Sequence, residues 1–265
     1  MSLEQIIILG LIQGIAEFLP ISSSAHLALL PHLVGWEDQG LGNDIAAHLG
    51  TLLAVIIYFR KQIRGSIVAL AGSDASRAAT PERRLIGLVL LATVPAAVLG
   101  YLLHDFADNV FRDPLIIAST TIVFGGILWL ADVKGSRVRD EDTVTLKDAL
   151  LIGLMQALAL VPGTSRAGIT MTAGLMLGLT RQAAARFSFM LAIPIIALAS
   201  AYEIYKLYSL ESQSNPVVFS LIALIAFASA YLTIHFFIKF LDRTGMLPYV
   251  IYRVAFGLVL FAIFL

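Results

Sequence analysis

Residues 10–26 read Gly-Leu-Ile-Gln-Gly-Ile-Ala-Glu-Phe-Leu-Pro-Ile-Ser-Ser-Ser-Ala-His, and this stretch decides the fold. It lies within an apolar segment, 3–34, that has more than the roughly 20 residues needed to cross a bilayer. A carboxylate, a proline and three serines nevertheless interrupt its middle. Such a break at membrane depth is tolerated only where protein or a polar cavity covers the freed backbone groups. The segment therefore predicts a re-entrant pair of half-helices.

A second apolar segment, 149–180, is interrupted in the same manner by Pro-Gly-Thr-Ser-Arg at 162–166, and it predicts a second re-entrant pair. Six other apolar segments are uninterrupted and have roughly the length of a transmembrane helix. They are 43–59, 85–103, 114–131, 183–206, 217–238 and 247–265. We therefore expect an all-α polytopic membrane protein with six transmembrane helices and two re-entrant helical hairpins.

The composition favours the same fold class. Hydrophobic residues make up 58% of the chain, charged residues only 14%, and the mean hydropathy is +0.87, whereas soluble domains have about 25% charged residues. Lys plus Arg and Asp plus Glu both number 18, so no net charge favours a nucleic acid partner. The lack of cysteine excludes disulfides, thiolate metal sites and cysteine nucleophiles. Apolar segments recur to the last residue, which predicts one integral membrane domain over 1–265 rather than a signal peptide and a soluble domain.

Basic residues orient the chain. The connections 60–84, 132–147 and 239–247 hold twelve Lys and Arg residues, whereas the alternating connections hold two. Because Lys and Arg are enriched in cytoplasmic loops, this bias predicts that these three connections face the cytoplasm and that both termini lie outside.

The two interrupted segments resemble each other. Residues 10–16 align with 153–159 at an offset of 143 residues, a proline follows in each, and Ser22-Ser23 falls on Ser165-Arg166. Three spans follow each copy, and this odd number turns the second copy upside down relative to the first. The pattern predicts inverted repeats, about 1–132 and about 146–265, as in many transporters. Chance likeness between short apolar helices is the alternative.

The first break carries groups suited to phosphate chemistry. Gln13 and Glu17 are four residues apart and share a helix face, and a carboxylate in an apolar membrane segment points to a function. Ser22–Ser24 follow the helix-ending Pro20 and can cap the next helix, whose free N–H groups form an anion site. His26 lies one turn beyond Ser23, so we expect a hydroxyl nucleophile with a base beside it.

The second break places a permanent positive charge at the start of a helix. Pro162 stops one helix, Gly163 allows a tight turn, and Thr164 or Ser165 can cap the next helix, with Arg166 in its first turn. The helix dipole and the apolar surroundings both disfavour a cation there, and an anionic partner removes both costs. A guanidinium suits bidentate contact with phosphate, so we expect both breaks to converge on one phosphate or pyrophosphate group.

Each of these residues also has a plainer interpretation. Glu17 could be a paired carboxylate that only orders the core, the serines could be simple caps, and His26 could be a satisfied core histidine. Arg166 is the hardest to explain structurally. His48 lies four residues after Asp44, which leaves a polar or metal-binding role open. Other cations in apolar segments are expected to snorkel or pair, namely Arg186, Lys239 and Arg253.

At these residues the chain resembles the undecaprenyl-diphosphatase family, membrane phosphatases also named for bacitracin resistance. The resemblance covers nearly the whole chain and rests on Gln13-x-x-x-Glu17, Phe-Leu-Pro-x-Ser-Ser at 18–23 with His26, His-Leu-Gly-Thr-Leu-Leu-Ala-Val at 48–55, and the 162–166 motif. It implies hydrolysis of undecaprenyl diphosphate to the monophosphate and inorganic phosphate, which recycles a lipid carrier for peptidoglycan and other envelope polymers. It also implies location in the cell membrane and a divalent cation, Mg²⁺ or Ca²⁺.

The resemblance assigns roles residue by residue. Glu17 matches the essential acid, Ser23 the nucleophile, His26 the general acid/base and Arg166 the phosphate clamp. Further phosphate contacts are expected from Ser22, Ser24, Gly163, Thr164 and Ser165, and cation ligands from Glu17 and Gln13. Three positions depart from the common pattern: Gln13 replaces a frequent Glu, which weakens a two-carboxylate metal site, Ala25 replaces a frequent Gly, and Ala167 replaces a Ser that would donate to phosphate.

Two mechanisms and three rival functions follow from these motifs. Ser23, deprotonated by His26, attacks the terminal phosphorus, or His26 activates water and Ser23 only binds phosphate. A prenyl-phosphate flippase would use the same anion pocket but needs no base beside a hydroxyl. A phosphatidic-acid-type lipid phosphatase has a His downstream of its Ser-Arg motif, and no such His follows Ser165-Arg166 here. A structural scaffold would not bury Glu17 and Arg166. We expect the active site to open on the outer face, and the sequence leaves a homodimer open.

Overall fold

The computed structural model describes residues 1–71, 81–110, 113–209 and 215–265, and its regular elements there are helices. Six described helices are long and apolar enough to cross a membrane. They are α3 (Leu41–Tyr58), α5 (Pro81–Val110), α6 (Pro114–Lys134), α9 (Arg181–Ser209), α10 (Pro216–Thr244) and α11 (Leu247–Phe264). The predicted all-α membrane fold with six spans is thereby confirmed.

One helix was not predicted. The helix α4 (Arg60–Ala71) continues from α3 within the basic connection 60–84, after a break at Phe59. It was missed because its polar residues make it too hydrophilic for a span, although it has no Pro or interior break that would prevent a helix.

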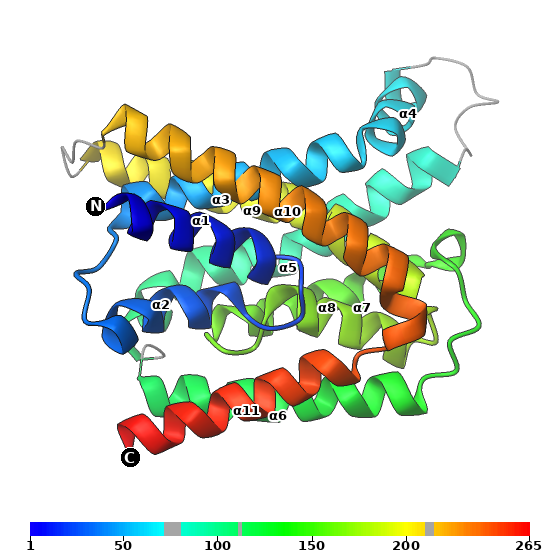
Figure 1. The fold of residues 1–265 in the computed structure, drawn as a ribbon. Helices are drawn as coiled ribbons and strands as arrows, with labels where there is room; N and C mark the ends of the chain where they lie inside the picture. The colour runs from blue at the N-terminus through cyan, green and yellow to red at the C-terminus, as the bar shows by residue number, and fades with distance from the viewer. Residues whose placement is uncertain (72–80, 111–112, 210–214) are drawn as a thin grey trace.

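Each interrupted segment forms a helical hairpin. The first consists of α1 (Leu3–Ala16) and α2 (Ser23–Val34), and the second of α7 (Leu146–Ala157), the short 3₁₀ helix Leu158–Leu160 and α8 (Arg166–Met176). Figure 1 shows that α1 and α7 enter from opposite ends of the molecule and that both hairpins lie above the pair α6 and α11. The predicted helix breaks are present, and the depth of the turns in a bilayer stays a prediction.

Each hairpin packs on a long helix from the other half of the chain: α1 lies against α10 and α7 lies against α5. Small residues allow this close approach. A Cβ added at Gly153 of α7 would lie 2.3 Å from the carbonyl oxygen of Ala92, and one added at Gly14 of α1 would lie 1.8 Å from Ser229 Oγ. Helices of the two halves of the chain are therefore packed closely against each other, and the single domain over 1–265 stays a prediction.

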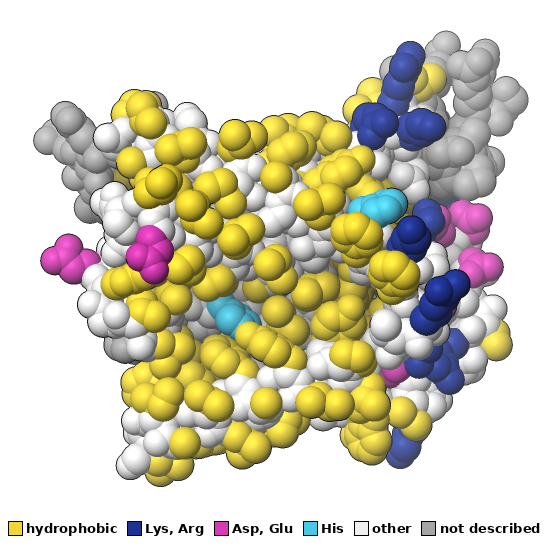
Figure 2. Space-filling model, in the orientation of Figure 1, with side chains coloured by type: hydrophobic (Ala, Val, Ile, Leu, Met, Phe, Trp, Pro, Cys, Tyr) yellow, Lys and Arg dark blue, Asp and Glu magenta, His cyan; other side chains and the backbone are white. Residues whose placement is uncertain are grey.

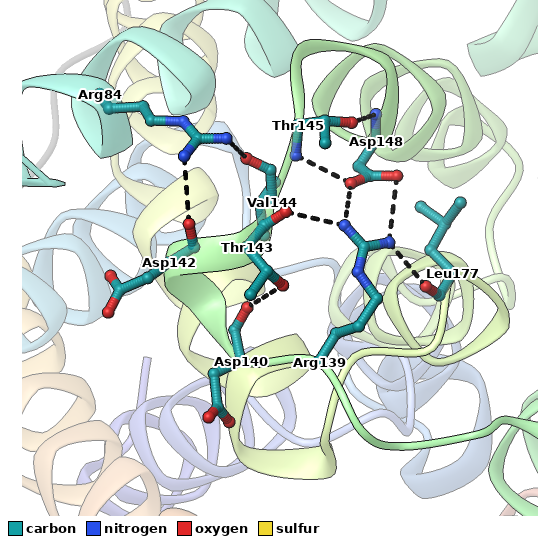
Figure 3. Close-up of polar contacts among 9 residues, drawn as sticks. All are labelled: Arg84, Arg139, Asp140, Asp142, Thr143, Val144, Thr145, Asp148 and Leu177. Atoms are coloured by element: carbon teal, nitrogen blue, oxygen red, sulfur yellow. Dashed lines mark hydrogen bonds and ion pairs between the residues drawn. The ribbon is translucent and has the colours of Figure 1, made fainter.

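The connection before α7 is fixed by a buried carboxylate (Figure 3). Asp148 forms a 2.6 Å ion pair with Arg139 and accepts a 2.8 Å hydrogen bond from the N–H of Thr145. In return, the hydroxyl of Thr145 accepts a hydrogen bond from the N–H of Asp148. Arg139 also donates to the carbonyl oxygens of Thr143 and Leu177. These contacts set where the second hairpin begins. Burial works to raise the pKa of Asp148, but hydrogen bonds from Arg139 and Thr145 outweigh it and hold the pKa below its ordinary value.

Replacing Asp148 by asparagine is therefore expected to destabilise the fold by about 1–3 kcal/mol at pH 7. A carboxylate with a lowered folded-state pKa stabilises above the ordinary Asp value of about 3.9 and loses this effect as the pH falls through the folded value. Thermal unfolding in detergent at pH 7 and at pH 3 measures this difference. The difference in stability between wild type and Asp148→Asn should be smaller at pH 3 than at pH 7. A difference that is unchanged or larger at pH 3 contradicts a stabilising role of the ionised Asp148 carboxylate.

The two ends of the molecule differ in charge. On the face shown in Figure 2, Lys and Arg side chains gather at the end where α4 lies, and hydrophobic side chains cover much of the width between the ends. Both termini lie at the opposite end (Figure 1). This separation is the arrangement that the loop charges predict.

Candidate active site

The hairpin turns have matching backbone geometry. Ser22 and Ser165, which the internal alignment pairs, have φ values of +74° and +70°, a conformation that non-glycine residues rarely adopt. Each serine caps the helix that follows, since Ser22 Oγ accepts from the N–H of Ala25 and Ser165 Oγ accepts from the N–H of Gly168. Backbone strain of this kind clusters at functional sites. It also presents Ser23 and Arg166 as the first residues of α2 and α8.

Glu17 joins the two hairpins. Its Oε1 accepts a 2.7 Å ion pair from Arg166 of the second hairpin, and its Oε2 accepts a 2.8 Å hydrogen bond from the hydroxyl of Ser23. Gln13, one turn earlier on α1, donates to Oε2 at 3.0 Å. The Glu17 side chain is only 7% exposed, so this carboxylate depends on these three donors. The structure thus brings Glu17, Ser23 and Arg166 together, and their convergence on a phosphate group stays a prediction.

Arg166 is held on several sides. Besides Glu17, its guanidinium donates to the carbonyl oxygen of Ser188 on α9 at 3.2 Å and lies 5.9 Å from the centre of the Phe18 ring. The hydroxyls of Ser188 and Thr170 are 2.7 Å apart. The guanidinium therefore has a fixed orientation before any ligand arrives, which reduces the ordering cost of binding an anion.

His26 is not brought together with Ser23. Its Nδ1 lies 2.7 Å from the carbonyl oxygen of Ser22 and must donate there, so in the neutral ring Nε2 accepts from the hydroxyl of Tyr252. The ring also stacks on Phe256, with centroids 4.5 Å apart. Because the Ser23 hydroxyl donates to Glu17 instead, the expected Ser23–His26 pair is absent from this structure. Sequence spacing placed both residues on one helix but did not give the direction of either side chain.

The other predicted phosphate ligands surround the same turns. Ser24 is exposed and its hydroxyl lies 3.2 Å from that of Ser22. Gly163 has a φ of +89°, which glycine adopts readily, and a Cβ added there would lie 2.2 Å from Thr120 Oγ1 of α6. Both features require a glycine at this position. Thr164 is buried, and its hydroxyl has no hydrogen-bond partner among the residues that the structure describes. A buried hydroxyl without a partner is unusual and calls for an explanation, and a ligand bound at the turn before α8 would supply an acceptor.

Comparison with known proteins assigns the chain. A family model described as bacitracin resistance protein BacA matches residues 6–259. The chain belongs to the BacA family. It is 52% identical to Undecaprenyl-diphosphatase 2 of Stutzerimonas stutzeri, covering 100% of this chain and 99% of that protein. It is 51% identical to an undecaprenyl-diphosphatase of Thioalkalivibrio sulfidiphilus, with all of both chains covered, and 49% identical to Undecaprenyl-diphosphatase 1 of Pseudoalteromonas translucida, with 97% of each covered.

Few side chains of this BacA-family chain are placed where they could hold a metal ion. Within the described residues, no group of three or more His, Cys, Asp or Glu side chains is placed to hold a metal ion. Glu17 nevertheless offers carboxylate oxygens, and Gln13 Oε1 is buried without a hydrogen-bond partner. Hard oxygen ligands of this kind fit Mg²⁺ or Ca²⁺ when substrate phosphates complete the coordination. His48 directs Nδ1 to the carbonyl oxygen of Asp44 on its own helix.

Two residues of the site escaped the sequence analysis. Tyr252 was not singled out from the sequence, yet its hydroxyl binds His26. Arg253 was expected to snorkel or pair, yet it is fully buried and donates to the turn carbonyls of Pro20 and Gly163. The signal that could have found Arg253 is its position, since it lies six residues into a span where snorkelling to the interface is not available.

Proposed function

We propose that this chain hydrolyses undecaprenyl diphosphate to undecaprenyl phosphate and inorganic phosphate, and so recycles the lipid carrier for peptidoglycan and other envelope polymers. The observation that carries the proposal is the contact of Arg166 and Ser23 with the two oxygens of Glu17 across the two hairpins. The curated relatives, similar over their whole length, are named for this activity. No observation supports the flippase alternative.

Phosphate binding would use both helix starts. The N-termini of α2 and α8 carry partial positive charge, and Arg166 adds a full charge suited to two phosphate oxygens. The exposed hydroxyl of Ser24 and the enclosed, unpaired hydroxyl of Thr164 would be further donors. Arg166 would exchange part of its contact with Glu17 Oε1 for oxygens of the diphosphate.

Glu17, rather than His26, would act as the base toward Ser23. The Ser23 proton passes along the 2.8 Å hydrogen bond to Glu17 Oε2, and the Ser23 oxygen attacks the terminal phosphorus. The bond from that phosphorus to the bridging oxygen breaks, and its electron pair leaves on the prenyl phosphate. Water then hydrolyses the phosphoserine to release inorganic phosphate. In the alternative, water attacks directly and Ser23 only binds phosphate, and trapping a phosphoserine distinguishes the two.

Gln13 Oε1 and the Glu17 Oε1 that Arg166 partly releases would hold the divalent cation, which leaves Glu17 Oε2 for the Ser23 proton. The charge of the cation would stabilise the negative charge that develops on the phosphate oxygens. His26 would keep the first turn in place, because its Nδ1–H binds the carbonyl oxygen of Ser22, the residue with positive φ. Its contact with Tyr252 fixes α2 against α11.

The orientation of the chain in the cell membrane is part of the proposal. Basic residues gather at the end that holds α4, and such residues favour the cytoplasmic side. Both termini and the opening of the site would then lie on the outer face, and both hairpins would be re-entrant. Whether two chains form a homodimer stays a prediction.

The proposal is tested by phosphate release from a long-chain prenyl diphosphate by purified protein in detergent. The expected products are one inorganic phosphate and one prenyl monophosphate per substrate, with loss of activity after removal of divalent cations by a chelator. Prenyl-lipid transfer across proteoliposomes without phosphate release would instead support a flippase and reject the proposal.

A further inference from the structure

Arg253 is the largest side chain that is wholly enclosed in the described part of the structure, with an exposed fraction of 0%. It lies on α11, a helix apolar enough to cross a membrane. No carboxylate among the described residues pairs with it, and its hydrogen-bond acceptors there are all backbone carbonyl oxygens. A cation inside a membrane segment is costly, and an apolar side chain would fill the same space without that cost. The charge therefore points to a function.

The three acceptors of Arg253 come from three separate elements. Nε donates to the carbonyl oxygen of Thr121 on α6 at 2.9 Å. Nη2 donates to that of Gly163 at 2.7 Å, and Nη1 to that of Pro20 at 3.3 Å. Pro20 lies three residues before Ser23, and Gly163 lies three residues before Arg166. One planar group thus joins the turn that leads to Ser23 and the turn that leads to Arg166.

Neighbouring residues make room for this arrangement and extend it. A Cβ added at Gly125 of α6 would lie 3.3 Å from Arg253 Nε, and one added at Gly168 of α8 would lie 3.0 Å from Nη1. The hydroxyl of Thr120 donates to the carbonyl oxygen of Pro162 at 2.6 Å. The second turn is therefore anchored on α6, and Arg253 connects the first turn to the same anchor.

We propose that Arg253 is a positioning residue of the phosphatase site, which fixes the first hairpin turn relative to the second. The inference rests on the proposed function, because the geometry that it fixes is that of Ser23 and Arg166 around a diphosphate. A displacement of reacting groups by about 1 Å can lower a rate roughly 100-fold. Bridging two carbonyls requires the fork of a guanidinium, which a lysine ammonium lacks.

The test compares Arg253→Met and Arg253→Lys with Arg181→Met. Arg181 is a matched control, since it also joins separate elements: it binds Asp132 of α6 at 2.6 Å, and Asp132 accepts from the N–H of Met246 before α11. Thermal unfolding in detergent measures the folded fraction, and kcat and KM are measured per folded protein. We expect Arg253→Met to lower kcat by roughly 30–100-fold with a smaller change in KM, and Arg253→Lys to recover little of it. We expect Arg181→Met to lower the unfolding temperature but leave kcat near the wild-type value.

A second readout does not depend on activity. The chain has no cysteine, so spin labels can be placed on Ser24→Cys and Leu158→Cys, two exposed positions beside the two turns. Pulsed dipolar spectroscopy then gives the distance distribution between the hairpins. We expect Arg253→Met to broaden this distribution and Arg181→Met to leave it unchanged.

Several outcomes overturn the proposal. They are a folded Arg253→Met with wild-type kcat, full rescue of kcat by Arg253→Lys, and a distance distribution that Arg253→Met leaves unchanged. An equal loss of kcat in Arg181→Met would show that removal of any arginine that joins separate elements has this effect. If the wild-type chain releases no phosphate, the proposed function fails, and the distance distribution still decides whether Arg253 fixes the two turns.

Discussion

Replacing Arg166 by alanine is expected to lower kcat/KM for a long-chain prenyl diphosphate by at least ~100-fold, because it removes a preorganised charge from the reacting phosphate. Arg166 lies at the start of α8 with its side chain only 13% exposed, and it binds Glu17 and the carbonyl oxygen of Ser188. Its removal also leaves the buried Glu17 carboxylate with hydrogen bonds from Ser23 and Gln13 but without a counter-charge. Phosphate release by purified protein measures the loss.

The control for this prediction is Arg139→Ala. Arg139 also forms an ion pair with a buried carboxylate, Asp148, but at the far end of the second hairpin. The Arg139→Ala substitution should reduce the stability of the fold, while kcat/KM per folded protein stays close to the wild-type value. Full activity in Arg166→Ala would reject the phosphate clamp, and Arg166→Lys should recover only part of the loss because an ammonium cannot bind two phosphate oxygens side by side.

Replacing Ser23 by alanine is expected to have a comparable or larger effect. If Ser23 is the nucleophile, the loss in kcat should be roughly 1,000-fold or more, as for other enzymes that lose a nucleophile. The Ser23 hydroxyl is hydrogen-bonded to the carboxylate that would take its proton. Phosphate release is again the measurement, combined with mass spectrometry of wild-type protein quenched during turnover, which should reveal a phosphoserine at residue 23.

Ser119→Ala is the matched control for Ser23→Ala. Ser119 is an exposed serine of α6 whose hydroxyl binds only the carbonyl oxygen of Leu115 one turn earlier. It should leave kcat unchanged. A Ser23→Ala variant with only a modest loss of kcat and a raised KM would favour direct attack by water, with Ser23 as a phosphate ligand.

The sequence predicted the fold and the centre of the site because both depend on local signals. A proline and serines within an apolar segment identify the breaks at Pro20 and Pro162. The charges of Glu17 and Arg166 in apolar segments indicated that both breaks meet around one anionic group, with a paired Glu17 as the plainer alternative. The structure contains both breaks and a 2.7 Å contact between the two side chains. The six spans follow from length and hydropathy alone.

Other features depend on tertiary contacts that spacing does not encode. The one-turn separation of Ser23 and His26 gave no information about χ angles, and the structure directs His26 toward Tyr252 of α11. Arg253 acquires its role only when α11 meets both hairpin turns, more than 200 residues from Pro20 in sequence. The positive φ of Ser22 and Ser165 likewise follows from the tight turns, since serine has no intrinsic preference for that region.

The central claim is that the two hairpin turns form one diphosphate site, and an experimental structure with a prenyl methylenediphosphonate tests it most directly. This analogue keeps the charge of the substrate but cannot be cleaved between its two phosphorus atoms. We expect the terminal phosphonate to lie within hydrogen-bond reach of both Ser23 Oγ and the Arg166 guanidinium. A phosphonate bound against only one hairpin, or at a place that neither Ser23 nor Arg166 reaches, would contradict it.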